Sequence, residues 1–183
     1  MWPSDLSVLQ GDVMLIRETT HRFSPFSVHR AMVGRTWPVM ASACGRAQLC
    51  FRNDEERESL LALLARSAHP GNAAARNRRF VDAMVNKARA VGYAESEAEL
   101  EQKMSAIAIP VRMDGRVLAS LSLIFFSSAM TTAEAAREHL AAMHDAADAI
   151  TRALYAERER SGDRRGVPES APAPEAAVLQ AAS

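Results

Sequence analysis

Residues 107–125, IAIPVRMDGRVLASLSLIF, decide the fold of this chain. Two apolar runs flank Asp114-Gly115, a dipeptide that favours the tight turn of a β-hairpin. Successive side chains of a strand point to opposite faces, so the second run divides into two sets. One face carries Ala119, Leu121, Leu123 and Phe125, and the other carries Ser120, Ser122 and Ile124. We therefore expect an antiparallel hairpin here.

The N-terminal part predicts further strands. Residues 6–9 and 13–16 flank Gln10-Gly11-Asp12, a short polar connection with the glycine that a hairpin turn needs. A third strand is predicted over residues 27–33, where the residues alternate, and Pro25 predicts an irregular or edge start for it.

Helices are predicted in the middle and at the end of the chain. The first covers residues 40–51 and follows Pro38, a residue that a first helical turn accepts, and the second begins after a cap at Asn53 or Asp54. A third keeps helical spacing over residues 80–91 and stops at Gly92, and a long fourth helix runs from Thr131 or Thr132 to about Tyr155. The order β-β-β, α-α-α, β-β, α predicts an α+β fold, a GAF-like antiparallel sheet flanked by helices.

Composition limits the function classes. The 183 residues contain 22 Lys and Arg and 22 Asp and Glu, giving no net charge, whereas a protein that grips DNA alone usually presents a concentrated basic surface. Two basic stretches, at residues 17–35 and 76–89, and a run of glutamates at 95–101 are interpreted as solvated faces. No apolar run approaches the ~18 residues of a membrane span, and no signal peptide is recognisable. We expect a soluble, cytoplasmic protein.

Signatures of catalysis are missing. The sequence has no phosphate-binding loop, no Rossmann fingerprint and no zincin spacing around His139 and His144. Cys44 and Cys50, six residues apart on a predicted helix, would lie about 240° apart around its axis, which suits neither a disulfide nor one shared metal. Near a helix N-terminus Cys44 could have a lowered pKa, but a small packing residue is the simpler interpretation. We expect no enzyme, no metal and no cofactor.

The start of the first helix is the candidate binding feature. Small residues follow Pro38, and the unpaired backbone N–H groups of a helix start attract anions, carboxylates included. Trp37 could form an apolar wall, and His29 or Arg35 could add charge. A purely structural cap, packed against the sheet, explains the same residues equally well.

Four stretches resemble the effector-binding domain of IclR-family transcriptional regulators over roughly residues 1–156. They are MVGRTWPVMASACGRA (32–47), VNKARAVGYA (85–94), SAIAIPV (105–111) and GRVLASLS (115–122), in the family's order and at its intervals. Residues 2–6 and 14–25 look like the branch that regulates catabolism of hydroxyphenylpropionates and related aromatic acids.

The resemblance implies a curved sheet enclosing one small-molecule effector, with its carboxylate at the helix start. The residues it assigns to the ligand are His29, Trp37, Ala43, Cys44, Ser96, Ala106, Ser122 and Ile124. Met40 replaces the family's usual histidine, Ser96 stands where an acidic residue is common, and Ile124 stands where a member that binds a small keto acid has serine. Fewer polar groups favour an aromatic carboxylic acid over a glyoxylate-sized ligand.

The resemblance also implies a domain organisation and partners. We expect an effector-binding domain over residues 1–156 and a flexible Ala/Pro-rich tail over 157–183, because that tail contains few residues able to form a core. Family members form dimers or tetramers and contact DNA through an N-terminal winged helix-turn-helix, which is not found in this chain. Two alternatives remain: a GAF-like thiol or sulfoxide enzyme using Cys44 or Cys50, and an oligomerisation module without a ligand.

Overall fold

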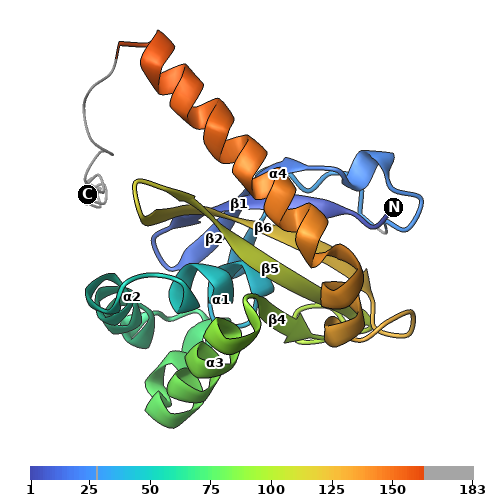
Figure 1. Cartoon of the computed structure of the whole chain (residues 1–183). Helices are drawn as coiled ribbons and strands as arrows, with labels where there is room; N and C mark the ends of the chain where they lie inside the picture. Colours follow the sequence, from blue (N-terminus) through green and yellow to red (C-terminus); the bar gives the residue numbers. More distant parts are fainter. Residues whose placement is uncertain (28, 163–183) are drawn as a thin grey trace, which may run out of the picture.

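The computed structural model describes residues 1–27 and 29–162 of the chain. Its six strands form one antiparallel sheet in the order β3-β2-β1-β6-β5-β4. Helix α4 crosses one face of this sheet, and α1, α2 and α3 lie on the other (Figure 1). The predicted α+β fold, an antiparallel sheet flanked by helices, is confirmed.

The N-terminal half begins with the predicted hairpin. It consists of β1 (Ser4–Gln10) and β2 (Val13–Thr19), followed by the short helix η1 (His21–Phe23) and β3 (Thr36–Pro38). Gly11 takes the positive φ of 61° that the turn between β1 and β2 requires.

The prediction of a strand over residues 27–33 is wrong. The described residues of this segment form no strand, and the third strand is β3 instead. Gly34 has a φ of 87°, which reverses the chain. Hydrogen bonding to β2 starts at this residue: Gly34 N–H donates to Ile16 O, and Ile16 N–H donates to Arg35 O. Residues after the turn therefore form the edge of the sheet, and residues 29–33 before it form a loop.

Helix α1 (Ala43–Cys50) is buried along its whole length against the sheet. It starts three residues later than predicted, because Ser42 caps it and Pro38 ends β3 rather than sitting in a helical turn. A side chain at Gly45 would overlap the backbone of Val39. Glycine therefore allows the chain that leads into α1 to pack directly on the helix.

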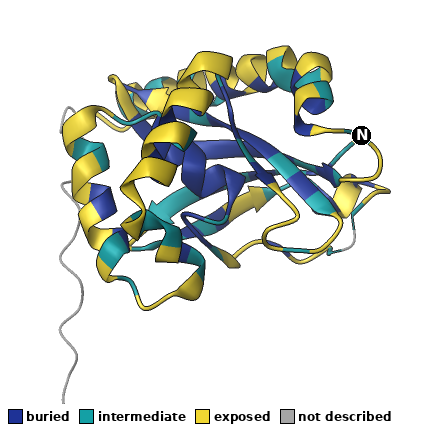
Figure 2. Cartoon of the chain, turned by 90° about the horizontal axis from the view of Figure 1, so that it is seen from below, coloured by how far each residue is buried: buried dark blue, intermediate teal, exposed yellow. Residues whose placement is uncertain are grey.

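The outer helices cover α1. Helix α2 (Asp54–Arg66) is capped by Asn53, one of the two predicted cap residues, and the 3-10 helix η2 (Pro70–Arg76) follows it. Helix α3 (Arg78–Val91) ends at Gly92 in the left-handed conformation, also as predicted. Burial concentrates in the sheet and in α1, whereas the outward faces of the other helices are exposed (Figure 2).

The C-terminal half contains the deciding hairpin. After β4 (Ala94–Glu97), which the sequence analysis did not predict, β5 (Met104–Met113) and β6 (Arg116–Phe126) pair across Asp114-Gly115. Helix α4 (Thr132–Arg160) begins with a complete capping box between Thr131 and Glu134. The helix continues past its predicted end near Tyr155, so residues 157–160, predicted as part of a flexible tail, are helical. Residues 163–183 lie outside the described residues, so the rest of the tail stays a prediction.

None of the helices in the described part of the chain is both long enough and apolar enough to cross a membrane.

Candidate functional site

A cavity of about 80 Å³ lies on the face of the sheet opposite α4. Its walls come from strands β1, β3, β4, β5 and β6, from η1 and the start of α1, and from the loops before β3 and after β4. Apolar atoms make up most of the surface that lines the cavity, although nine of the seventeen lining residues have polar or charged side chains. An apolar surface with placed polar groups is the usual character of a small-molecule site.

All eight residues assigned from the resemblance line this one cavity: His29, Trp37, Ala43, Cys44, Ser96, Ala106, Ser122 and Ile124. That they bind a ligand stays a prediction. Arg35, which we considered as a source of charge, is not among the lining residues, and neither is Met40, which is buried in the core.

The sheet supplies one wall as a ladder of neighbouring positions. Ser96 of β4 pairs with Ala106 of β5, and Ala106 pairs in turn with Ile124 of β6. Paired residues on adjacent strands point to the same face, so these three side chains stand in a row. Ser122, two residues from Ile124 on the same face, donates from Oγ to the carbonyl of Asp5 at 3.3 Å.

The start of α1 faces the cavity with Ser42, Ala43 and Cys44. Ser42 is a structural cap: its Oγ accepts from Gly45 N–H at 3.1 Å and donates to Pro38 O at 2.7 Å. Within the described residues, the N–H groups of Ala43 and Cys44 have no hydrogen-bond acceptor. The Ser42 side chain therefore caps only the third amide of the helix and leaves the first two without an acceptor; that they bind an anion stays a prediction.

The wall also contains an ionisable pair that was not predicted from the sequence. Asp5 of β1 and His21 of η1 are both 4% exposed, and His21 Nε2 lies 3.6 Å from Asp5 Oδ1. Burial raises the pKa of Asp5, while the Thr19 hydroxyl and His21 partly oppose that shift. Asp5 and Ser7 occupy the buried face of β1, and this polar alternation was the one indication available in the sequence.

Two loops meet at the mouth of the cavity. His29 Nε2, from the loop before β3, lies 3.2 Å from Oε1 of Glu101, which follows β4. Both side chains are about one third exposed, so this contact lies at the surface. The other lining residues that the sequence analysis missed are Met32, Ser42, Leu100, Met104 and Ser105.

The cysteines do not have the properties of reactive thiols. Both are free and buried. Burial raises the pKa of Cys44, contrary to the lowering considered for a helix start, and raises the pKa of Cys50 to about 12. Among the described residues, no group of three or more His, Cys, Asp or Glu side chains is arranged to hold a metal ion.

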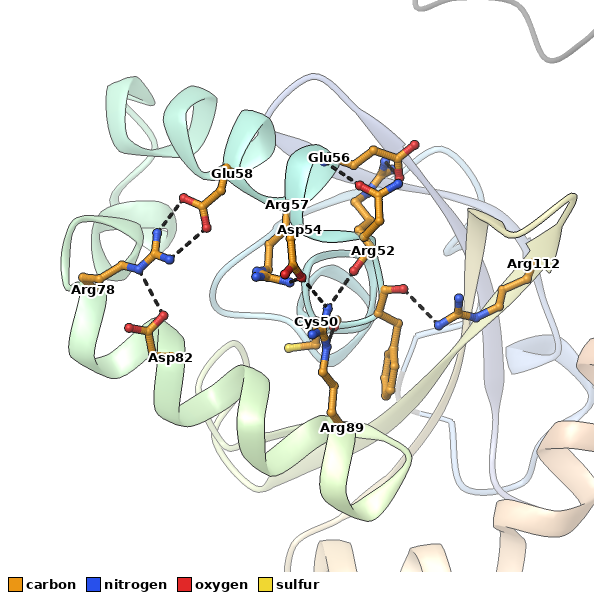
Figure 3. A network of polar contacts seen from close by, with 12 residues as sticks. Cys50, Arg52, Asp54, Glu56, Arg57, Glu58, Arg78, Asp82, Arg89 and Arg112 are labelled. Carbon is orange, nitrogen blue, oxygen red and sulfur yellow. Dashed lines mark hydrogen bonds and ion pairs between the residues drawn. The ribbon is translucent and has the colours of Figure 1, made fainter.

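The basic side chains of the runs at residues 17–35 and 76–89 are exposed, in agreement with solvated faces, and several of them make ion pairs or hydrogen bonds at the surface. Arg78 donates two hydrogen bonds to the carboxylate of Glu58, at 2.6 and 2.9 Å (Figure 3). Arg89 donates to the carbonyls of Cys50 and Arg52, both at 2.8 Å. Each glutamate of the 95–101 run also has a partner. The pairs are Glu95 with Lys87, Glu97 with Thr132, Glu99 with Arg46 and Glu101 with His29.

Comparison with solved structures gives the same fold. The IclR protein of Thermotoga maritima is 19% identical with a TM-score of 0.69, covering 84% of this chain and 61% of that one. The C-terminal domain of the Escherichia coli regulator KdgR is 24% identical with a TM-score of 0.63, covering 82% of this chain and 85% of that domain. An IclR homolog from Microbacterium hydrocarbonoxydans, complexed with 4-hydroxybenzoate, is 24% identical with a TM-score of 0.61, covering 85% of this chain and 61% of that one.

The chain thus spans about three fifths of the Thermotoga and Microbacterium proteins. Residues 4–152 match the family profile described as the C-terminal region of the bacterial transcriptional regulator IclR. With that match over most of its length, this chain belongs to the IclR family of bacterial transcriptional regulators and carries the family's C-terminal, effector-binding domain.

Proposed function

We propose that this domain senses a monocyclic aromatic carboxylic acid in the cavity beside α1. The observation that carries the proposal is one space with apolar walls that also contains the start of a buried helix. The 4-hydroxybenzoate complex of the Microbacterium homolog supports this ligand class. Because family members are transcriptional regulators rather than enzymes, the alternative of a thiol or sulfoxide enzyme is set aside.

The apolar walls favour an aromatic ring over a small keto acid. Trp37, Ile124 and Met104 present large apolar side chains to the cavity. A ring gains roughly 25 cal/mol for each Å² of apolar surface that it buries against such walls. Glyoxylate and pyruvate bring little apolar surface and would leave this lining poorly filled.

The helix start is the proposed carboxylate anchor. The N–H groups of Ala43 and Cys44 add their partial positive charge to that of the helix dipole, and together these favour an anion. Ala43 has a small side chain that lets a ligand approach this backbone. A larger residue at position 43 would fill that approach.

Calorimetry with the purified domain tests the proposal. We expect benzoate and 3-phenylpropionate derivatives to bind more tightly than glyoxylate or pyruvate. Ala43→Leu should abolish this binding while circular dichroism shows an intact fold, and Ala62→Leu, at an exposed position of α2, should leave binding unchanged. Tighter binding of the keto acids, or normal affinity in Ala43→Leu, would refute the proposed site. Absence of binding by any acid would favour an oligomerisation module without a ligand.

The proposed mechanism is a population shift. A ligand changes a regulator only through its different affinities for two arrangements of the subunits, and coupling of about 1–3 kcal/mol is typical. We propose that the domain works in the cytoplasm as a homodimer or homotetramer, and that it reaches DNA only through the winged helix-turn-helix of the full-length regulators.

A further inference from the structure

The carboxylate of Asp5 lies in the same cavity as the proposed carboxylate anchor. Asp5 is 4% exposed and lines the cavity together with Ala43 and Cys44 of the α1 start. Its charge reaches this helix start: burial is the main cause of the raised pKa of Cys44, and the negative charge of Asp5 adds to that shift. A ligand carboxylate held by the first amides of α1 would therefore meet a second negative charge in a poorly solvated space.

Asp5 has a cationic partner only when His21 is protonated. His21 Nε2 lies 3.6 Å from Asp5 Oδ1, and within the described residues this is the ion pair that Asp5 can form. Oδ1 also accepts from the hydroxyl of Thr19 at 2.6 Å, which holds the carboxylate in place. Ser122 of β6 donates to the backbone carbonyl of Asp5 and leaves the carboxylate charge uncovered.

The ring of His21 lacks the hydrogen that this role requires. Ser27 Oγ donates to His29 O at 2.7 Å and lies 2.7 Å from His21 Nδ1, so here it accepts, and Nδ1 carries the hydrogen of the neutral ring. Nε2 is then an acceptor that faces another acceptor, Asp5 Oδ1. Because Nε2 is fully buried and has no hydrogen-bond partner, neither water nor a ligand atom reaches it, but a proton between the two atoms would pair both.

We propose that His21 takes up a proton at Nε2 when the carboxylate of the effector enters the cavity, so that the domain binds the effector anion together with one proton. The inference rests on the function proposed above and adds a dependence on pH to it. The imidazolium donates to Asp5 Oδ1 and covers its charge, while the ligand's carboxylate lies at the start of α1. The proton comes from solvent and reaches the buried ring through Asp5, which faces the cavity.

The incoming anion drives the uptake in one direction. A nearby negative charge favours the charged form of an imidazole and disfavours the charged form of a carboxylate, so both members of the pair hold a proton more tightly once the ligand is bound. Burial raises the pKa of Asp5 in the ligand-free chain, which already favours a shared proton. Linkage makes the effect reciprocal, so a lower pH strengthens binding of the effector.

The other titratable groups around the pair do not supply the missing charge. Cys44 keeps its thiol proton at neutral pH, because burial raises its pKa. His29 and Glu101 meet each other at the surface, where water and salt screen their charges. Arg22, the neighbour of His21 in η1, is exposed. The proton is therefore assigned to His21.

Calorimetry with benzoate and 3-phenylpropionate tests the inference on the unaltered protein. Titrations at one pH in phosphate and in Tris, two buffers with different enthalpies of ionisation, give the number of protons taken up for each ligand bound. Near neutral pH we expect an uptake of about one proton, so the dissociation constant should rise about tenfold for each unit by which the pH is raised. Benzamide, a neutral analogue of benzoate, should bind without proton uptake.

Variants locate the proton. Asp5→Asn removes the negative charge that the imidazolium covers, and His21→Gln replaces the ring with an amide that donates to Asp5 without a charge. Each should abolish most of the uptake and leave the dissociation constant nearly independent of pH. Asp145→Asn is the matched control, because Asp145 is exposed on α4, on the opposite face of the sheet. It should keep the full uptake.

The outcomes separate the two proposals. Binding of aromatic acids without proton uptake overturns the coupling and leaves the aromatic-acid sensor intact, whereas no binding of any aromatic acid overturns both. Uptake that survives in Asp5→Asn or in His21→Gln also overturns the coupling, because the proton then lies on the ligand or at the mouth of the cavity. If either variant fails to fold, as judged by circular dichroism, nuclear magnetic resonance of the His21 ring in the unaltered chain decides. Benzoate should convert Nε2 to its protonated form, and an unchanged Nε2 signal contradicts the proposal.

Discussion

The two faces of β6 show opposite solutions to burying a strand. On the α4 side, Leu121, Leu123 and Phe125 pack into a cluster with α4 residues such as Met143. On the α1 side, the same strand presents Ser120, Ser122 and Ile124, and the last two line the cavity. The strand is one element, so the difference comes from what covers each face.

One face of β6 is closely packed, whereas the other borders the cavity. The α4 face is filled by apolar side chains, whose burial and close packing stabilise the folded state. The opposite face retains unpaired polar atoms at Ser7, His21 and Ser120, and each such atom costs about 1–3 kcal/mol when nothing hydrogen-bonds to it. Substitutions on the first face should therefore destabilise, and some on the second should stabilise.

The largest effect is expected for Phe125→Ala. Phe125 is fully buried under α4, and loss of a buried phenylalanine costs about 3–5 kcal/mol in the free energy of unfolding. Urea denaturation measures this loss. Phe126→Ala, at the half-buried neighbouring position, serves as the control and should cost clearly less. Equal losses at both positions would remove the contrast between the faces.

Gly45→Ala comes next and tests the close approach at α1. The new methyl group would overlap the backbone of Val39, and overpacking of this kind costs about 1–3 kcal/mol. Thermal unfolding should show a lower midpoint. An unchanged midpoint would mean that the segment leading into α1 can move away, and that α1 is not held rigidly beside the cavity.

Asp5→Asn should stabilise the ligand-free domain at neutral pH. Burial raises the pKa of Asp5, so the folded state binds its proton more tightly than the unfolded state does. Between the two pKa values stability therefore falls as the pH rises, and above the folded-state pKa the full penalty remains. The advantage of Asp5→Asn should shrink on acidification through that pKa. Denaturation curves across this pH range test it, and a neutral-pH loss of stability would contradict the prediction.

The smallest effect is expected for Ser7→Ala. Its hydroxyl is buried and unpaired, so removing it should leave the free energy of unfolding unchanged or raise it by up to about 1 kcal/mol. Ser122→Ala provides the comparison, because Ser122 donates to Asp5 O and its loss should destabilise slightly. Destabilisation by Ser7→Ala would indicate an ordered water bound to this hydroxyl.

Local chemistry made several elements predictable. The turn at Asp114-Gly115 and the stop at Gly92 were predicted correctly, and Asn53 and Thr131 were each one of two residues predicted at a helix start. All four features depend on a few neighbouring residues. The alternation in β6 likewise assigned its two faces, because the pleat of a strand imposes a period of two.

Elements set by distant partners were not predictable from local pattern. Strand β4 contains only Ala94–Glu97, and three of its four residues are polar or charged; it is a strand because it pairs with the edge of β5. The segment 27–33 alternates like a strand, but residues after Gly34 occupy the edge of β2. In both cases the pairing partner, and not the intrinsic preference of the segment, made the choice.

The residues of the candidate site were likewise predictable only in part. The eight residues assigned from the resemblance all line one cavity, because the motifs around Ala43, Ala106 and Ser122 share the family's order along the chain. The Asp5–His21 pair was missed, because these residues lie on different elements and approach each other only when the chain turns after β2.

By itself the sequence determined the antiparallel hairpins, the helix caps, the α+β class and membership of the family, because these depend on turn chemistry, periodicity and ordered motifs. Only the tertiary structure decided which strands form the edges, that Ser42 leaves the first amides of α1 free, and that a buried carboxylate and imidazole share one cavity. Those features depend on contacts between residues far apart in the chain, and a cavity exists only where several elements meet without filling the space between them.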